Sequence, residues 1–226
     1  MSRGYFVTGT DTGVGKTLVS AALLHAFAAQ DLRVVGMKPV AAGCEWCDGE
    51  PYWEDVAQLQ AASNVDVPLS LRNPYRFDPP IAPHIAAAQA GTEIEIATLR
   101  QAYADLQSHA DMVIVEGAGG FYVPLNESET MADLARQLNL PVILVIAMRL
   151  GCINHALLTA QAIVGQGLTL AGWVANQLDP QMQVLADNLS SLQQRISAPL
   201  LGILPYQHPV SAQQVSMRLQ IGKLSL

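Results

Sequence analysis

The stretch GTDTGVGKT, Gly9 to Thr17, decides the fold. It follows a short apolar run at residues 5–8 and leads into residues 17–30, where apolar side chains recur at helical spacing. A strand, a glycine-rich turn and a helix in this order are typical of a loop that binds phosphate with main-chain N–H groups and the positive end of a helix. Gly9 stands one residue earlier than the usual spacing requires, and Thr10 takes the expected position.

Despite this shift, the loop keeps the residues that hold phosphate. Lys16 is expected to reach the β- and γ-phosphates, and the Thr17 hydroxyl is expected to bind Mg²⁺. The alternative is a strand, turn and helix with an incidental Lys-Thr pair, but all three elements fall where the motif needs them. The residues expected to bind a nucleotide here are Gly13, Val14, Gly15, Lys16, Thr17 and Leu18.

Composition limits the kinds of protein that this chain can be. Its 226 residues, 50% hydrophobic and 14% charged, suit one domain with a sizeable core. A formal net charge of −7 argues against nucleic acid and against an anionic membrane surface as partners. Three cysteines suit a reducing compartment, and we see neither a signal peptide nor an apolar run of bilayer length. We therefore expect a soluble cytoplasmic protein.

Short apolar runs alternate with helical patterns along the chain, which predicts an α/β fold. After the strand at residues 5–8, further strands are expected at 33–37, 111–115, 142–147, 170–175 and 200–204. After the helix at 17–30, further helices are expected at 53–62, 92–109, 129–138, 153–165 and 181–196. Residues 41–52 are expected to be loop, and residues 64–91, with their prolines, irregular with short helical pieces. We expect a mostly parallel sheet of about seven strands, covered by helices on both faces.

Parallel sheets bind ligands at the carboxyl ends of their strands, so the residues at these ends are candidate site residues. Lys38 follows the second strand, and Glu116 begins the run Gly117, Ala118 and Gly119 after the 111–115 strand. Asn176 follows the 170–175 strand, and Pro205 follows the last one. Lys38 could also be a surface cation, but the chain has only three lysines, and we favour a phosphate contact.

A magnesium ion takes further oxygen ligands, typically one or two carboxylates. Glu116, at the tip of a buried strand, is the first candidate, and Asp55 is the second. Each could instead be an ordinary acid of a turn or of a first helical turn. Asn154 is expected to cap the helix at 153–165, whose free N–H groups could hold an anion. The pair Cys44 and Cys47 has no second pair for a zinc site, and we expect it to be structural.

Five motifs, in this order, resemble the dethiobiotin synthetase family: GTDTGVGKT, GMKPVAAG, VIVEGAGG, GCINHALLTAQAI and GWVAN. The resemblance runs from about residue 5 to 205 and implies a P-loop NTPase-like fold in a single domain spanning residues 1–226. It also implies an activity, the ATP- and Mg²⁺-dependent closure of 7,8-diaminononanoate and CO₂ into dethiobiotin in biotin biosynthesis. In such enzymes a carbamate attacks the γ-phosphate, and the second amine of the substrate closes the ring on the resulting carbamic–phosphoric anhydride. A homodimer is implied as well.

The resemblance assigns a role to each candidate. Lys16 and Lys38 match the lysines that neutralise the phosphates and the carbamate, and Thr12 lies near the transferred group. Thr17, Asp55 and Glu116 match the Mg²⁺ ligands. The positions that match substrate-binding residues are Ala42, Cys152, Ile153 and Asn154, and those beside the adenine are Asn176, Pro205, Tyr206 and Gln207.

Some positions depart from the family pattern. Gly13 stands where some members have Glu, Ala42 where relatives have Ser or Thr, and Asn188 where some have a tyrosine that crosses the dimer interface. These changes bear on substrate affinity rather than on reaction class. The main alternative is a nucleotide switch of the partition or cell-division type, but those proteins carry a signature lysine where this chain has Asp11.

Overall fold

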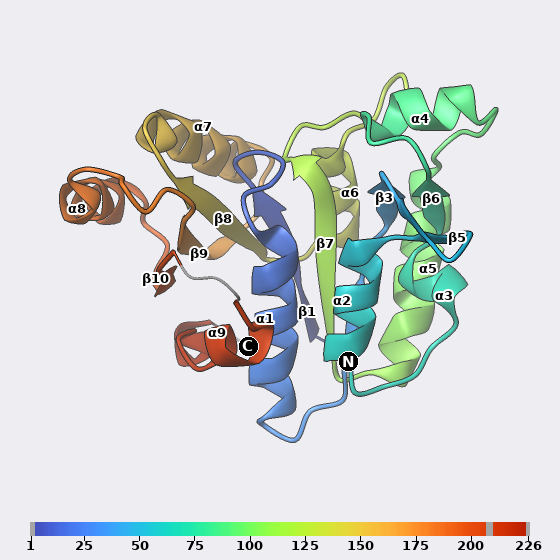
Figure 1. Cartoon of the computed structure of the whole chain (residues 1–226), viewed down its shortest axis with the longest axis horizontal. Helices are drawn as coiled ribbons and strands as arrows, with labels where there is room; N and C mark the ends of the chain where they lie inside the picture. The colour runs from blue at the N-terminus through green and yellow to red at the C-terminus, as the bar shows by residue number, and fades with distance from the viewer. Residues whose placement is uncertain (1–2, 207–209, 225–226) are drawn as a thin grey trace.

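The computed structural model describes residues 3–206 and 210–224, and a six-stranded parallel sheet forms its centre (Figure 1). The strand order is β10-β9-β8-β1-β7-β2. The strands are β1 Arg3–Gly9, β2 Val34–Met37, β7 Met112–Gly120, β8 Val142–Met148, β9 Leu170–Gln177 and β10 Leu200–Leu204. The α/β class and the parallel sheet are confirmed, with six strands in this sheet instead of about seven.

Two small sheets lie outside the central one, in segments expected to be loop or irregular. β3 (Val40–Ala42) pairs in parallel with β6 (Tyr75–Phe77), and β4 (Glu45–Cys47) forms an antiparallel hairpin with β5 (Glu50–Tyr52). The hairpin turns at Asp48 and Gly49, whose φ angles are 52° and 84°. Asp-Gly with two positive φ angles is a favoured two-residue hairpin turn. The sequence therefore carried a hairpin signal that the loop expectation missed.

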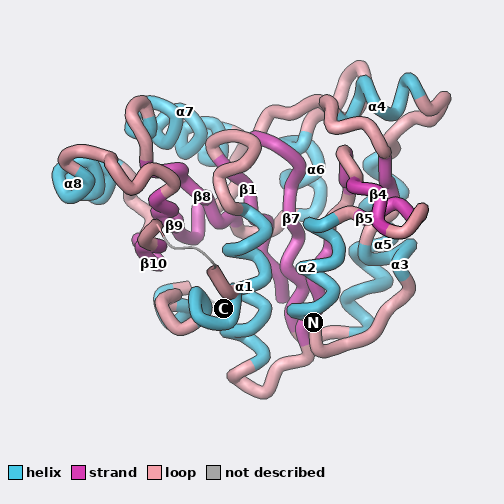
Figure 2. Tube along the Cα trace, in the orientation of Figure 1, coloured by secondary structure: helices cyan, strands magenta, loops and turns pink. Residues whose placement is uncertain are grey.

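Helices cover both faces of the central sheet, as expected (Figure 2). The helices of the described residues are α1 Lys16–Ala28, α2 Glu54–Ala62, α3 Leu69–Arg72, α4 Pro83–Gln89, α5 Ile96–His109, α6 Met131–Leu138, α7 Cys152–Gly165, α8 Leu185–Arg195 and α9 Ala212–Ser216, with a 3-10 turn η1 at Ile221–Lys223. In Figure 1, α1, α2 and α9 lie in front of the sheet, and α6 and α7 lie behind it.

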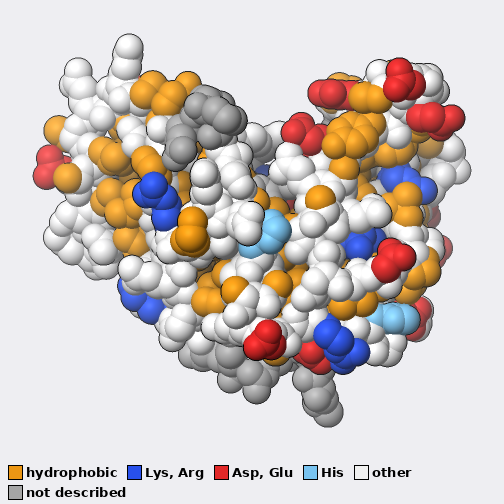
Figure 3. All heavy atoms as spheres, turned by 60° about the horizontal axis from the view of Figure 1, so that its bottom comes forward, with side chains coloured by type: hydrophobic (Ala, Val, Ile, Leu, Met, Phe, Trp, Pro, Cys, Tyr) orange, Lys and Arg blue, Asp and Glu red, His pale blue; other side chains and the backbone are white. Residues whose placement is uncertain are grey.

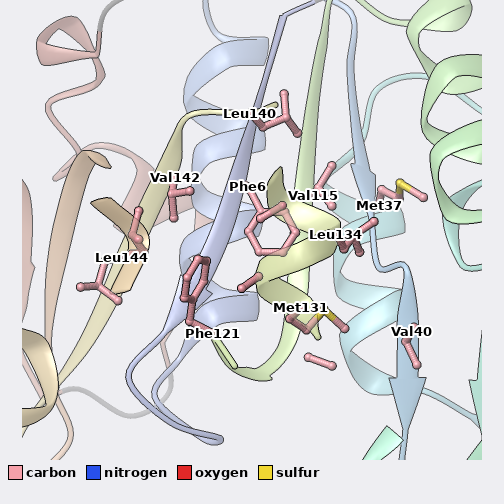
Figure 4. Packing of buried hydrophobic residues seen from close by; sticks show 14 of the residues in the cluster. Phe6, Met37, Val40, Val115, Phe121, Met131, Leu134, Leu140, Val142 and Leu144 are labelled. Carbon is pink, nitrogen blue, oxygen red and sulfur yellow. The ribbon is translucent and has the colours of Figure 1, made fainter. Parts of the chain in front are cut away.

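The core has two layers because side chains alternate along each strand. In β1, Phe6 packs into one hydrophobic cluster with residues of α5, α6 and α7, whereas Tyr5 and Val7 pack into the other with residues of α1 and α9. Figure 4 shows Phe6 among Val115, Leu134 and neighbouring side chains of the first cluster. The central strands are therefore buried on both sides, which explains their apolar runs without alternation.

Two helices start later than expected. α5 begins at Ile96, so Glu93 lies before the helix and Glu95 is its N-cap residue instead of both lying in its first turn. The backbone N–H of Glu95 donates to the Tyr75 hydroxyl, and this contact keeps the residue extended. α8 begins at Leu185 rather than at residue 181, after Val184 in a left-handed conformation with φ of 50°.

β7 is longer than expected, and this places Glu116 within a strand rather than after one. It continues through the glycines to Gly120, with Glu116 beside Val7 and Gly120 beside Gly9 of β1. The carboxylate of Glu116 is therefore fixed by the sheet next to the loop that follows β1.

In the described part of the chain, none of the helices has the length and apolar character to cross a membrane. On the face seen in Figure 3, Lys and Arg side chains are scattered among acidic and uncharged groups and form no continuous basic patch.

The first turn of α6 provides a test of local stability. Thr130 and Asp133 form a capping box, in which each side chain accepts a hydrogen bond from the other's backbone N–H. We expect Thr130→Ala to lower the free energy of unfolding by about 1 kcal/mol in urea denaturation. Thr98→Ala is the control, because its exposed hydroxyl donates to the exposed Glu95 carboxylate, and we expect little change. Equal stability of the Thr130→Ala variant and the unmutated protein would contradict the role of the cap.

Candidate active site

The candidate site is a cleft of about 670 Å³ at the carboxyl ends of β1, β2 and β7. In Figure 1 this is the upper edge of the sheet, where the arrowhead of β7 lies near the loop that precedes α1. The cleft is lined by Thr12, Gly13, Gly15, Lys16, Thr17, Lys38, Ala42, Asp55, Pro80, Ile81, Ala82, Pro83, Glu116, Ala118, Gly119 and Val123. The structure thus brings together most of the residues that the sequence placed at the phosphate, metal and reaction positions.

The loop between β1 and α1 has the conformation of an anion cradle. Gly13 and Gly15 have φ angles of 72° and 92°, and α1 begins directly after Gly15. A side chain at Gly15 would also meet the Asn176 amide nitrogen at 2.3 Å, so only glycine fits there. Val14 is buried beneath the loop, at 1% exposure, and does not line the cleft. Because α1 begins at Lys16, the positive end of this helix lies at the loop, where it favours an anion.

Lys16 is buried and held near the mouth of the cradle. Its Nζ donates a hydrogen bond of 2.9 Å to the main-chain oxygen of Asp11. Burial, followed by repulsion from Lys38, lowers the pKa of Lys16 to about 8, while Glu116 and Asp55 act in the opposite direction. An anion bound beside Lys16 would favour its charged form.

Lys38 lies at the end of β2 and bridges two carboxylates. Its Nζ is 2.7 Å from Asp55 Oδ2 and 2.5 Å from Glu116 Oε1. Burial by itself would lower the pKa of Lys38, but attraction to Glu116 and Asp55 outweighs it, so the pKa is raised. The Asn73 side chain donates to the Lys38 carbonyl oxygen at 2.6 Å, and the Lys38 N–H donates to the Arg72 carbonyl oxygen at 2.8 Å. The end of α3 therefore fixes the backbone that carries this lysine.

Three oxygen-bearing side chains converge beside Lys38. Thr17 Oγ1 lies 2.9 Å from both Asp55 Oδ1 and Glu116 Oε1. A hydroxyl carries one proton, so it can satisfy only one of these two contacts at a time. Glu116 is fully buried, and its Oε2 has no hydrogen-bond partner.

This donor set fits a small hard cation, which prefers carboxylate and hydroxyl oxygens and completes its shell with phosphate or water. Burial raises the pKa of Asp55, but the charge of Lys38 outweighs this and lowers it, so the carboxylate is ready to bind a cation. Within residues 3–206 and 210–224 no group of three or more His, Cys, Asp and Glu side chains could hold a metal. A site here would therefore depend on one hydroxyl and two carboxylates.

A second, smaller cavity of about 140 Å³ lies on the other side of the phosphate loop. Its lining includes Leu18, Asn176, Pro205 and Tyr206, the residues expected beside a nucleotide base. The Asn176 side chain donates to the Val14 carbonyl oxygen at 2.9 Å and thus joins β9 to the loop. The expected residue Gln207 lies outside the described residues. Val210 also lines this cavity, near the position where an acid that can contact the ribose in the family is absent from this sequence. The sequence did not single out the other lining residues: Gln177, Leu178, Leu204, Gln214, Val215 and Arg218.

The start of α7 differs from the expectation. Gly151, with φ of 91°, is the N-cap residue, and Asn154 lies inside the first turn, so its expected role as cap is wrong. The Cys152 N–H donates to the Arg149 carbonyl oxygen at 3.0 Å, and this turn starts the helix earlier. Cys152 is buried, Asn154 is exposed, and neither they nor Ile153 line the cleft of this chain.

Sequence reasoning also missed residues 80–83 and Val123 as cleft residues. Residues 80–83 belong to the proline-containing segment, where periodicity gives no placement, although Pro83 at the start of α4 is a recognised helix-start signal. Gly117 does not line the cleft, because it packs on the ring of Phe6. Cys44 and Cys47 are free thiols outside the cleft lining.

Comparison with known proteins assigns the family. A family model described as "AAA domain" matches residues 3–214. The ATP-dependent dethiobiotin synthetase BioD of Nitrosospira multiformis is 57% identical over 226 residues, covering 100% of this chain and 98% of that protein. The enzyme of the same name from Aromatoleum aromaticum is 54% identical over 219 residues, covering 97% of each.

Solved structures agree on the fold. The septum site-determining protein MinD of Pyrococcus horikoshii, solved with Mg-ADP, superposes with a TM-score of 0.62 at 13% identity, over 98% of this chain and 96% of that one. MinD of Aquifex aeolicus gives a TM-score of 0.55 at 13% identity, over 96% and 94% of the two chains. At such identities the similarity shows the P-loop NTPase-like fold alone. The family model and the near full-length relatives at more than half identity go further: the chain belongs to this AAA-domain family and, within it, to the dethiobiotin synthetases, which are ATP-dependent ligases.

Proposed function

We propose that this chain closes 7,8-diaminononanoate and CO₂ into dethiobiotin, using Mg-ATP, in biotin biosynthesis. The observation that carries the proposal is the meeting of Lys16 and Lys38 with three oxygen ligands in one cleft beside a phosphate cradle. The names of the two relatives supply the product, dethiobiotin, and the use of ATP.

The proposed chemistry has two bond-forming steps. One amine of the substrate adds to CO₂ and loses a proton, giving a carbamate. A carbamate oxygen attacks the γ-phosphorus, and the bond to the ADP oxygen breaks, which leaves a carbamic–phosphoric anhydride and ADP. The second amine then attacks the carbonyl carbon, phosphate leaves with the carbamate oxygen, and the amine proton is lost. Phosphoryl transfer of this kind needs positioning and charge neutralisation more than a protein nucleophile.

In this proposal the two lysines neutralise the charge that moves in the reaction. Lys16, at the loop, binds the β- and γ-phosphates, and Lys38, on the other side of the cleft, faces the carbamate and the transferred phosphoryl group. Thr12 lines the same cleft, and a Cβ added at Gly119 would lie 3.5 Å from its Oγ1. In this proposal Thr12 donates a hydrogen bond to the transferred group.

Thr17, Asp55 and Glu116 would hold the magnesium ion, which, when bound, supplies positive charge to the β- and γ-phosphates. Lys38 bridges the same two carboxylates in the structure, so part of their negative charge is already compensated before a nucleotide enters. The cradle residues Gly13, Gly15 and Lys16 would bind the phosphates, and Leu18, Asn176, Pro205, Tyr206 and Gln207 would surround the adenine.

For the substrate, we propose that Ala42 lines the diamine end of the site and that residues 152–154 receive the carboxylate tail. The start of α7 does not line the cleft of its own chain, so we propose a cytoplasmic homodimer in which sites lie near the interface between the subunits. Analytical ultracentrifugation at micromolar protein concentration tests the dimer, and a molar mass equal to that of one chain would contradict it.

The function is tested by incubating purified protein with diaminononanoate, ¹³C-bicarbonate and Mg-ATP, followed by mass spectrometry. We expect a ureido product that carries one ¹³C, and phosphate release that requires diaminononanoate. Phosphate release that does not change when diaminononanoate is left out, with no labelled product, would instead indicate a nucleotide switch.

Lys38 is expected to act in the reaction rather than in nucleotide binding. We expect Lys38→Met to reduce product formation by at least about 100-fold, because charge developing in the transition state loses a buried partner, while ADP binding persists. Lys223→Met is the matched control, since Lys223 is exposed and donates to the Leu200 carbonyl oxygen, away from the cleft. Turnover of the Lys38→Met variant close to that of the control would refute this role. Circular dichroism should accompany the assay, because Glu116 loses its buried counter-ion.

Variants of Asp55 and of its neighbour Glu54 distinguish a loss of Mg²⁺ binding from the mere loss of one negative charge. We expect Asp55→Asn to raise the Mg²⁺ concentration for half-maximal activity by about tenfold or more, because a charged ligand is lost. Glu54→Gln should leave the Mg²⁺ dependence unchanged, since Glu54 is exposed and accepts a hydrogen bond from Gln58. The same Mg²⁺ dependence in both variants would exclude Asp55 as a ligand.

The lowered pKa of Lys16 predicts how nucleotide affinity depends on pH. The ammonium form binds phosphate, and in the free protein this form is lost as the pH rises through about 8. ATP affinity should therefore be constant below this pH and fall by up to about tenfold per unit above it, with proton uptake on binding. Calorimetry from pH 6.5 to 9.5 in buffers of different ionisation enthalpy checks both effects. Affinity that stays flat up to pH 9.5 would show that Lys16 remains charged.

A further inference from the structure

Asp11 of the phosphate loop is paired with Arg149, which follows β8. Arg149 Nη2 lies 2.8 Å from Asp11 Oδ2, and the two side chains are 47% and 52% exposed. The residues are 138 positions apart in the chain, so the contact joins the loop after β1 to the segment between β8 and α7. None of the roles proposed above uses this pair.

The remaining polar groups of Asp11 set the shape of the loop. Its Oδ1 accepts the Thr12 N–H at 2.8 Å, and its main-chain oxygen accepts Lys16 Nζ at 2.9 Å. Asp11 thus contacts two residues that line the cleft, and the direction of its carboxylate determines where the first turn of the loop lies.

Arg149 is itself held from the other side. Its carbonyl oxygen accepts the Cys152 N–H in the turn that starts α7, and Gly151 in this turn adopts a φ of 91°. The guanidinium therefore extends from a backbone fixed by β8 and α7, and it presents its charge to the loop before any nucleotide binds.

An unpaired carboxylate at this position would oppose phosphate binding. Two like charges a few ångströms apart repel each other, even at high dielectric. An exposed ion pair adds little to the stability of the fold, so stability alone gives no reason for this contact. Its effect on the electrostatics of the cradle is larger, because the cradle must accept a polyphosphate.

We propose that Arg149 is a positioning residue of the nucleotide site, which neutralises Asp11 and holds its carboxylate away from the phosphates. The main-chain N–H groups of the loop and Lys16 then face the anion without a competing negative charge. Arg149 acts through Asp11 and need not touch the nucleotide. The inference rests on the proposed binding of ATP, but on neither the diamine substrate nor the ring closure.

The test measures ADP affinity by calorimetry, without diaminononanoate or bicarbonate. We expect Arg149→Met to raise the dissociation constant of ADP by about tenfold, because Asp11 is left uncompensated. Arg149→Lys should stay within about threefold of the unmutated protein, since an ammonium also neutralises a carboxylate. Arg136→Met is the control, because Arg136 is an exposed arginine that also pairs with an acid, the partly exposed Asp133, at 3.4 Å and away from the cleft.

The decisive variant is the double substitution Arg149→Met with Asp11→Asn. The asparagine keeps an acceptor for the Thr12 N–H and removes the charge, so ADP affinity should return to within about threefold of the unmutated protein. A double variant as weak as Arg149→Met, or unchanged affinity in Arg149→Met itself, would overturn the proposal. If the ADP affinities are as expected but the protein does not close the ring, the role of Arg149 stands and only the proposed function fails. The two proposals can therefore be tested separately.

Discussion

The site depends on one buried cluster of charge, in which the Lys38 ammonium is bound between the carboxylates of Glu116 and Asp55. Glu116 is fully buried and Lys38 nearly so, and neither charge would be stable there alone. Removal of one partner from a buried pair typically costs about 3–5 kcal/mol, because the other charge is left unpaired. Replacement of any one of these charged side chains by a neutral one is therefore expected to destabilise this end of the sheet.

The topology of the sheet allows this cluster to form. Lys38 follows β2, and Glu116 lies within the neighbouring parallel strand β7. Thr17 comes from the helix that follows β1, the other neighbour of β7. Because parallel strands point the same way, residues 99 positions apart meet at one edge. The two apolar clusters on either side of the sheet hold these strand ends rigid, and the end of α3 fixes the backbone of Lys38. The chemistry thus rests on side chains with little freedom to move.

Much of this edge could be predicted from the sequence, because strand ends and a glycine loop leave local signals. Lys38, Glu116 and Asn176 each follow or lie in an apolar run, and all three reach the site. Where a segment has no periodic pattern of apolar residues, its contacts with distant parts of the chain could not be predicted from the sequence. The lining by residues 80–83 and the pair of Asp11 with Arg149 depend on tertiary packing that no local pattern records. The cap of α7 was misplaced because a glycine in a left-handed conformation started the helix before the expected asparagine.

The same fold serves a septum site-determining protein, so the fold alone does not select the reaction. In the proposed function, the distinction lies in the groups that would face the γ-phosphate. In this proposal, these groups present the γ-phosphate to a carbamate rather than to water. Freshly dissolved C¹⁸O₂, given with diaminononanoate and Mg-ATP in unlabelled water, tests this directly. Transfer to a carbamate predicts that the released phosphate carries ¹⁸O from the CO₂ in a single turnover. Phosphate that contains only oxygen from ATP and water would contradict it.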